Sequence, residues 1–383
     1  MNSLGVYVHV PFCAGKCPYC DFYSRPYRKA DAAAYVRAAA QDMSRFRDDR
    51  FPADTLYFGG GTPSLLPPEL LGELIAAVRE SFRLAPKAEI TLEANPNTVS
   101  PARARLWAAM GINRLSCGLQ SAESGELQVL GRRHTPEQAA LAVQAALDAG
   151  ISNISLDVML GVPGQTAESL RRTLEFACAL PLTHLSAYLL KPEPDTPYWD
   201  SPLLRECPEE EELAGLYLRT AAFLEEAGFR HYEISNFARP GFESRHNRKY
   251  WLCQEYLGFG PGAHSFFAGK RYGYARSLEE YISAPGARPI VTDAEAGGLE
   301  ERILLGLRLR EGIPLSLLEP LEPEARAAFL RKARRLESGG LARLSERLSL
   351  TPEGFLVSNA ILADLLAVLP EDVGTLANPS CDL

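Results

Sequence analysis

The sequence lacks the features that would place the protein in a membrane, on a nucleic acid or in an oxidising compartment. None of its apolar runs approaches the length of about 20 residues that spans a bilayer, and no signal-peptide pattern precedes the first strand. Lys and Arg number 40 against 48 Asp and Glu, and the net charge of −8 argues against a broad surface for nucleic acid. We therefore expect a cytoplasmic protein without a transmembrane segment and without a nucleic-acid partner.

Cysteine is also scarce, and its distribution argues against a disulfide framework. The chain has 8 cysteines, and cytosolic proteins keep such thiols reduced. Three of them lie close together, at Cys13, Cys17 and Cys20. The others are scattered and are expected to be buried or incidental thiols: Cys117, Cys178, Cys207, Cys253 and Cys381.

The three clustered cysteines follow a strand and therefore lie on a loop. Residues 6–10 alternate in the manner of a strand, and Pro11 ends it. Closely spaced thiolates on such a loop are typical of a [4Fe-4S] cluster, in which three cysteines leave the fourth iron open to the amino and carboxylate groups of a small molecule. The alternatives are a zinc site completed by His9 and an incidental group of thiols. Zinc ligands usually come in two separate pairs, and the alternation directs His9 away from the loop, so the cluster is favoured.

Strands and helices alternate through the first half of the chain. Six successive β/α units predict an α/β fold, in which a parallel sheet with outer helices forms a partial (β/α)6 barrel. Functional residues of such folds gather at the carboxyl ends of the strands, where the cysteine loop lies. The predicted strands are residues 6–10, 55–58, 89–94, 114–117, 154–160 and 184–190, and the helices are residues 30–48, 67–82, 101–110, 123–130, 136–149 and 166–180.

The remainder divides into three parts. A helix at 208–227 and a strand at 232–237 complete a barrel domain of residues 1–235. Residues 236–297 are rich in aromatics, Gly and Arg and are interpreted as an irregular connecting segment. Helices near 299–310 and 322–338, a hairpin at 340–350 and a helix from Thr351 predict a small winged-helix-like domain at residues 298–370. Residues 371–383 are expected to form a disordered tail.

Glycine and polar residues follow several of these strands. Gly59–Thr62 ends the second strand, where backbone without a Cβ permits close approach of a ligand and N–H groups suit a carboxylate. Glu93, Gln120 and Asp157 lie in or just after the next three strands, and Arg132 lies in a loop. Each alone would be a capping or solvated residue, but their placement at one rim predicts a binding site beside the cysteine loop.

A histidine–aromatic motif, His246-Asn-Arg-Lys-Tyr250-Trp251, lies in the connecting segment. Its imidazole could ligate a haem iron, its rings could stack on the macrocycle, and the neighbouring cations could pair with the propionates. The alternative is a structural turn in which Trp251 fills the core and His246 bonds a carbonyl. On the residues alone, this alternative is favoured. His264, in Gly260-Pro-Gly-Ala-His264, is a second candidate in the same segment.

These motifs together resemble the radical S-adenosylmethionine (SAM) superfamily. The spacing Cys-x3-Cys-x2-Cys after a first strand is typical of it, and the longer string from Tyr7 to Cys20 resembles the branch of oxygen-independent coproporphyrinogen III oxidase and HemW-type haem chaperones. The resemblance extends from Tyr7 to about Leu366. It implies a [4Fe-4S] cluster on the three cysteines, whose open iron binds SAM and can reduce it to methionine and a deoxyadenosyl radical. It also implies SAM contacts from Tyr7, Tyr19, Gly60, Gly61, Thr62, Glu93, Gln120, Arg132 and Asp157.

The resemblance also separates two functions. The oxidase has a fourth cysteine where this chain has Phe22, and an N-terminal arm that we do not expect here. The chaperone branch has a His-Asn-x-x-Tyr-Trp motif, which makes His246, Tyr250 and Trp251 the candidate haem contacts and leaves His264 as a candidate for SAM or haem. The resemblance therefore implies a haem chaperone that delivers haem to acceptor haemoproteins, membrane-associated respiratory enzymes among them, as a monomer or a homodimer. The first alternative is coproporphyrinogen oxidation in porphyrin biosynthesis, and the second is a winged-helix protein that regulates or binds nucleic acid.

Overall fold

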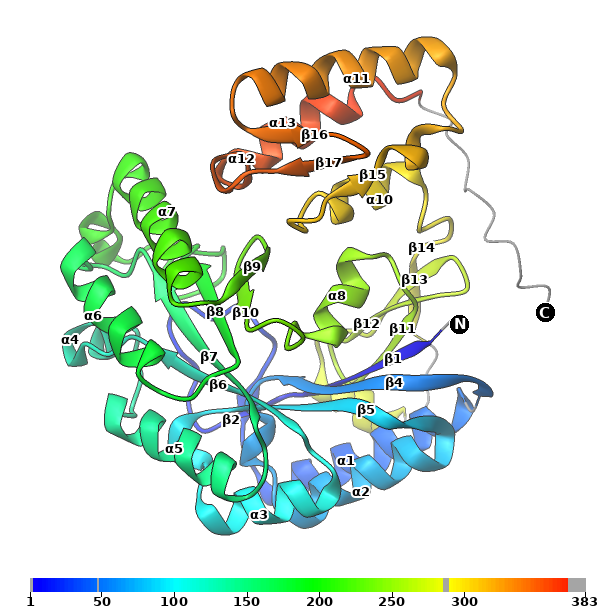
Figure 1. Cartoon of the computed structure of the whole chain (residues 1–383). Coiled ribbons are helices and arrows are strands. Elements are labelled where there is room, and N and C mark those ends of the chain that lie inside the picture. The colour runs from blue at the N-terminus through cyan, green and yellow to red at the C-terminus, as the bar shows by residue number, and fades with distance from the viewer. Residues whose placement is uncertain (1–2, 47, 285–288, 371–383) are drawn as a thin grey trace.

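A single large sheet dominates the computed structural model, which describes residues 3–46, 48–284 and 289–370 (Figure 1). The sheet has twelve strands in the order β14-β13-β12-β11-β1-β4-β5-β6-β7-β8-β10-β9. β11 thus lies beside β1, although about 250 residues separate the two strands in the sequence. In chain order the strands are β1 (Leu4–Val10), β4 (Asp48–Gly60), β5 (Phe82–Ala94), β6 (Arg114–Gln120), β7 (Asn153–Leu160), β8 (His184–Leu189), β9 (Arg230–Glu233), β10 (Asn236–Ala238), β11 (Tyr256–Phe259), β12 (His264–Phe267), β13 (Lys270–Gly273) and β14 (Ile290–Asp293).

The central strands run parallel and their helices cover the outer face, which confirms the predicted α/β barrel-like fold. All residues of β6 are buried, as expected for a strand covered on both faces. Figure 1 shows the outer helices following one another around the curved sheet. They are α1 (Lys29–Arg45), α2 (Pro68–Ser81), α3 (Pro101–Met110), α4 (Ser124–Val129), α5 (Pro136–Asp148), α6 (Ala167–Cys178) and α7 (Glu210–Glu226).

Local sequence explains where several of these helices begin and end. Thr135 and Gln138 form a reciprocal capping box at the start of α5, and Pro136 occupies its first turn, where a missing N–H costs nothing. Gly111 ends α3 with a φ of 97°, a left-handed conformation that glycine adopts without strain.

Residues 236–297 differ from the irregular segment that the sequence predicts. They contain β10 to β14, α8 (Arg245–Trp251) and α9 (Leu278–Ser283). β11 pairs in parallel with β1, and β12 to β14 extend the same sheet in antiparallel fashion. The periodicity missed them because strands of four residues are too short to show a pattern. The predicted strand at 232–237 is also a hairpin, since a turn at Ile234 and Ser235 separates β9 from β10.

The C-terminal part contains helices and a small separate sheet. Its strands lie in the order β15-β17-β16, so the predicted hairpin is present and a third strand joins it. The predicted tail, residues 371–383, lies outside the described residues. Within the described ranges, no helix is both long and apolar enough to cross a bilayer. The elements are α10 (Leu299–Gly306), β15 (Ile313–Pro314), α11 (Pro323–Ser338), β16 (Ala342–Leu344), β17 (Arg347–Leu350), α12 (Pro352–Leu356) and α13 (Ser358–Leu366).

Candidate functional site

A cavity of about 410 Å³ opens at the carboxyl ends of the parallel strands, beside the cysteine loop. It combines Cys20 with residues that lie in or just after β4, β5, β6, β7 and β8. All predicted SAM contacts except Tyr7 line it: Tyr19, Gly60, Gly61, Thr62, Glu93, Gln120, Arg132 and Asp157. As expected for the carboxyl ends of parallel strands, the fold brings together residues that are up to 138 positions apart in the sequence, from Tyr19 to Asp157.

The two ends of the cysteine loop are held together, and the loop contacts residues that line the cavity. β2 (Phe12–Cys13) and β3 (Arg25–Pro26) pair in parallel and hold the two ends of the loop together. Cys13 Sγ lies 3.5 Å from Thr62 Oγ1, and Arg132 donates to Cys17 Sγ at 3.7 Å. A guanidinium beside a thiolate offsets part of its negative charge, so the setting suits a cluster held by several thiolates.

The zinc alternative finds no support in the geometry. In the described ranges, no three His, Cys, Asp or Glu side chains converge on one point as ligands of a single ion. Both ring nitrogens of His9 are also engaged, with Tyr7 Oη at 3.2 Å and the carbonyl of Tyr23 at 2.9 Å. In a four-iron cluster each thiolate binds its own iron, so the sulfurs need only surround the cluster. The three cysteines therefore fit a [4Fe-4S] cluster better than a zinc ion.

The glycine turn after β4 packs against the protein's own chain and offers no free donors, contrary to the expectation from the sequence. Gly60 has a φ of 103°, and a Cβ on Gly61 would lie 2.7 Å from the carbonyl oxygen of Phe12. However, Gly60 N–H donates to Glu93, and the N–H groups of Gly61 and Thr62 donate to Val10 and Phe12 carbonyls. The missing Cβ atoms thus allow the turn to pack against His9 and Phe12, and its amides are already used within the protein.

Glu93 is held from two sides at the floor of the cavity. Tyr57 Oη donates to Glu93 Oε1 at 2.7 Å, and Gly60 N–H donates to Glu93 Oε2 at 3.2 Å. Burial, partly offset by the Tyr57 hydrogen bond, raises the pKa of Glu93 to about 7. Burial likewise raises the pKa of Asp157, which accepts a hydrogen bond from Ser116 at 3.4 Å. Two buried carboxyl groups in one cavity suit a ligand that brings hydroxyl or amino donors.

Arg132 and Gln120 complete the wall next to the loop. Arg132 also donates to Asn95 Oδ1 at 2.7 Å and to the Gly118 carbonyl at 2.9 Å. Gln120 has a φ of 69°, and its side-chain oxygen is buried without a hydrogen-bond partner. Because a buried acceptor without a donor is costly, this oxygen is well placed to accept from a ligand in the cavity.

Neither Tyr7 nor His246 lines the cavity. Helix α8 packs against β4, and its His246 ring stacks on Tyr57 and Tyr7 at centroid distances of 5.2 and 6.3 Å. His246 Nδ1 lies 2.8 Å from Thr55 Oγ1, and Nε2 lies 2.8 Å from Tyr250 Oη. Burial, followed by the charge of Lys249, lowers the pKa of His246 to about 3, so the ring is neutral. No ring nitrogen of His246 is therefore free to bind an iron in this arrangement.

The neighbouring cations of the motif are also paired within the protein. Arg245 and Lys249 contact Asp54 at 3.1 and 2.8 Å, and Arg248 contacts Glu311 at 3.1 Å. The Trp251 ring lies against the guanidinium of Arg308 at 4.5 Å. The structure thus favours a structural role for the motif, but as a helix and not as the expected turn. His246 bonds hydroxyl groups in place of the expected carbonyl, and Trp251 is only partly buried. Its partners Thr55 and Tyr57 lie about 190 positions earlier, which sequence spacing alone does not reveal.

Several cavity residues were missed by the sequence reasoning. They lie on or just after β5, β6 and β8, and for all but Ser116 the position at a strand end was the available signal. These residues are Asn95, Ser116, Tyr188, Leu189 and Lys191. His264, the remaining candidate, begins β12 and is exposed, but it does not line the cavity.

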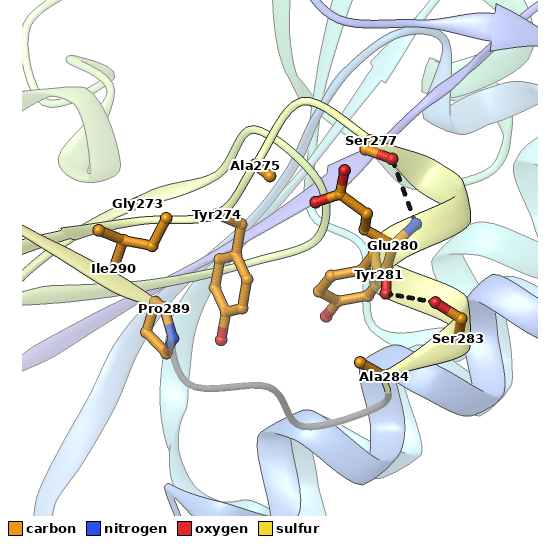
Figure 2. Close-up of a pocket in the computed structure, with 10 residues that line it drawn as sticks. All are labelled: Gly273, Tyr274, Ala275, Ser277, Glu280, Tyr281, Ser283, Ala284, Pro289 and Ile290. Carbon is orange, nitrogen blue, oxygen red and sulfur yellow. Dashed lines mark hydrogen bonds between the residues drawn. The ribbon is translucent and has the colours of Figure 1, made fainter.

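A second cavity, of about 350 Å³, lies between β13, the start of β14 and helix α9 (Figure 2). Tyr274 and Tyr281 form its wall, and the Ser277 and Ser283 hydroxyls bond to the backbone of Glu280 at 3.2 Å each. None of the residues predicted for SAM or haem lines it. The candidate site is therefore the first cavity.

Comparison with known proteins agrees with this geometry. Residues 7–177 match the radical SAM superfamily, and residues 298–357 match the HemN C-terminal domain. The chain is 34% identical over 96% of its length to the "Heme chaperone HemW" of Synechocystis, covering 97% of that protein. It is 36% identical to the protein of the same name from Mycobacterium tuberculosis, with 95% of both chains covered. It is also 36% identical to the bovine mitochondrial "Radical S-adenosyl methionine domain-containing protein 1", covering 96% of this chain and 88% of the other.

The fold also matches a solved structure. The coproporphyrinogen III oxidase of Escherichia coli, described as a radical SAM enzyme, aligns with a TM-score of 0.82 over 96% of this chain and 91% of the oxidase. Its sequence identity is only 23%, so this similarity establishes the fold alone. The superfamily implies a [4Fe-4S] cluster and SAM, which the cysteine loop and the cavity accommodate. The extent of the identity to the HemW proteins shows that this chain belongs to the HemW family of radical SAM proteins.

Proposed function

We propose that the protein is a haem chaperone, which binds haem and transfers it to acceptor haemoproteins. The observation that carries this proposal is the similarity to proteins named HemW, which extends over nearly the full length of both chains. The acceptors we propose are haemoproteins that include membrane-associated respiratory enzymes. Because an acceptor must be reached by diffusion, a chaperone needs no membrane segment of its own.

The cysteine loop and the cavity serve this function as a cofactor site. Cys13, Cys17 and Cys20 would hold the [4Fe-4S] cluster, and Arg132 would donate to the Cys17 sulfur. The bound cluster supplies one electron and an open iron for SAM. Glu93, Gln120 and Asp157 would accept hydrogen bonds from the hydroxyl and amino groups of SAM, and Gly60 and Gly61 line the same cavity. The protein side thus orients SAM and keeps it beside the loop.

The residue at position 22 favours transport over porphyrinogen oxidation. Phe22 lines the mouth of the cavity with 65% of its surface exposed. A phenyl ring there can neither ligate a metal nor move a proton. A large exposed aromatic ring instead suits contact with a flat apolar molecule.

The test is a titration of the cluster-replete full chain with ferric haem, with and without SAM, followed by mixing with an apo-haemoprotein. We expect saturable haem binding in the Soret absorption and transfer of haem to the acceptor faster than haem release into solution. The absence of saturable binding, or transfer no faster than release, would contradict the proposed function.

A further inference from the structure

A small groove of about 70 Å³, which we call the loop groove, also borders the cysteine loop. Cys17 lines the loop groove, whereas Cys20 lines the SAM cavity. The two openings share a wall, which is made by Thr62, Asn95 and Arg132. A cluster held by the loop therefore has one thiolate ligand at the groove and another at the SAM cavity.

Direct contacts join the two sides of the loop groove. A Cβ on Gly131 would lie 2.9 Å from Pro18 of the cysteine loop. A Cβ on Gly15, at the other end of the groove, would lie 3.1 Å from the guanidinium of Arg133. Both distances are shorter than ordinary Cβ contacts, so the cysteine loop and residues 131–133 pack closely and form one continuous surface.

The loop groove is basic, although the chain as a whole has a net charge of −8. Lys16, Arg132 and Arg133 line it, and none of its described lining residues is Asp or Glu. Lys16 and Arg133 are exposed, and in the part of the chain that the structure describes neither side chain forms an ion pair or a hydrogen bond. Their charges are therefore available to an anionic partner.

The size of the groove indicates the kind of partner. Pockets for small molecules and cofactors have volumes of roughly 300–1,000 Å³, and the SAM cavity, at about 410 Å³, is one of that size. The loop groove, at about 70 Å³, instead has room for a single side chain. A carboxylate on the surface of another protein fits it, and exposed cations steer an acidic surface toward it.

The position of the groove indicates what this partner supplies. A cluster that gives one electron to SAM must regain one electron before it can act again. The donor has to approach the cluster from a side that SAM does not occupy. The groove offers that approach, because it lies beside Cys17 and is bordered by the exposed residues 14–16.

We propose that the loop groove is the docking surface for an acidic protein that carries single electrons, with Lys16 and Arg133 as the residues that bind it. One electron passes from the reduced carrier to the oxidised cluster, so the carrier is oxidised by one electron and no proton or chemical group is transferred. The inference goes beyond the proposed function, since it rests on the cluster site and not on haem binding.

The test is stopped-flow reduction of the anaerobically reconstituted full chain by a reduced flavodoxin, an acidic one-electron carrier. Lys16→Gln/Arg133→Gln should be reduced about tenfold more slowly at low salt, and the difference should shrink as salt screens the attraction. Calorimetric titration with oxidised flavodoxin should show weaker binding by the same double variant. Arg331→Gln/Arg334→Gln, which removes two exposed charges from α11, is the matched control and should change neither quantity.

A small uncharged reductant, photoreduced deazariboflavin, separates docking from damage to the cluster. It should reduce all these proteins at one rate, and a slower rate in Lys16→Gln/Arg133→Gln would show that the substitutions act on the cluster and not on docking. Equal flavodoxin rates and affinities in the two double variants would overturn the proposal. A changed mass of Lys16→Gln/Arg133→Gln in sedimentation, at an unchanged flavodoxin rate, would instead assign the groove to a second copy of the chain.

Discussion

At the scale of single residues, Arg132 joins the cysteine loop to the cavity. Its guanidinium donates to Cys17, Asn95 and the Gly118 carbonyl, so one side chain ties the loop to β5 and β6. Burial, with smaller contributions from the neighbouring Cys17 and Cys13 sulfurs, raises the pKa of Cys20 to about 11, so a thiolate at Cys20 is costly without a cation. A bound cluster removes that cost, so the loop and the cluster should stabilise one another.

Cys17→Ser should therefore abolish the brown absorption of the anaerobically reconstituted protein, because a hydroxyl is a poor ligand for iron. Iron and sulfide analysis would measure the loss. Cys207→Ser, which changes a partly buried cysteine outside the loop, is the matched control and should retain the cluster. Full iron content in Cys17→Ser would refute the assignment of this ligand.

Glu93 should make SAM binding depend on pH. Because burial raises the pKa of Glu93 to about 7, lowering the pH from about 8 to about 6 converts most of the carboxylate to the weaker acceptor, the neutral acid. SAM affinity should fall several-fold over this range in calorimetric titration. Glu93→Gln has no titratable group there, so any dependence that comes from SAM itself will be the same in both proteins. Equal pH dependence of the two proteins would contradict this role.

Some residues of this site could be predicted from the sequence and others could not, for a physical reason. Cys13, Cys17 and Cys20 are close in the chain, and Glu93 and Asp157 follow a rule that holds for every parallel barrel. His246 was different, because a neutral buried histidine and an exposed ligand histidine have the same sequence pattern. Only the contacts with Tyr57 and Thr55, from a distant strand, distinguish the two.

At the scale of elements, helix α8 lies on the inner side of the curved sheet (Figure 1) and packs against β4. Its first two amides, of Arg245 and His246, donate to the carboxylate of the buried Glu89 on β5 at 3.2 and 3.1 Å. A carboxylate at this end of a helix satisfies N–H groups that have no partner within the helix. The helix in turn supports Tyr57, which holds Glu93 in the cavity.

Glu89→Ala should consequently destabilise the protein by about 2–4 kcal/mol, because it leaves two amides buried without an acceptor. Urea unfolding would measure the difference. Glu89→Gln keeps one oxygen acceptor and should cost less, and Glu73→Ala on the exposed face of α2 should be nearly neutral. A loss in Glu89→Ala no larger than that in Glu73→Ala would show that α8 is held by other contacts.

Long helices and strands could be predicted from the sequence, and short ones could not. The outer helices and the parallel strands repeat for long enough to show their pattern, but β11 to β14 have only four residues each. β11 pairs with β1, about 250 positions away, and β12 to β14 extend the sheet from β11, which no local pattern encodes. For this reason the sequence predicted an irregular connecting segment at residues 236–297, where the structure has strands and helices.

At the scale of the whole molecule, the fold is shared with a porphyrinogen oxidase, but the fold does not determine the activity. The resemblance in sequence implies a cysteine in the oxidase at the position of Phe22, which lines the cavity here. The C-terminal part matches the domain that follows the barrel in that family, and the net charge of −8 gives no basis for the nucleic-acid alternative.

The reconstituted protein should therefore form no protoporphyrinogen from coproporphyrinogen III in an anaerobic assay with SAM and a reductant. Product analysis by chromatography is the measurement, with a coproporphyrinogen oxidase as positive control. Formation of protoporphyrinogen at enzymatic rates would replace haem transfer with porphyrin synthesis as the function.

The pairing of β1 between β4 and β11 has a consequence for synthesis of the chain. Gly5 lies opposite Tyr256, so one edge of the first strand waits for a partner that the ribosome makes about 250 residues later. At about 5–20 residues per second, that edge stays open for some tens of seconds. An unpaired apolar strand invites association with other chains, so the nascent protein should depend on a ribosome-associated holdase until β11 emerges.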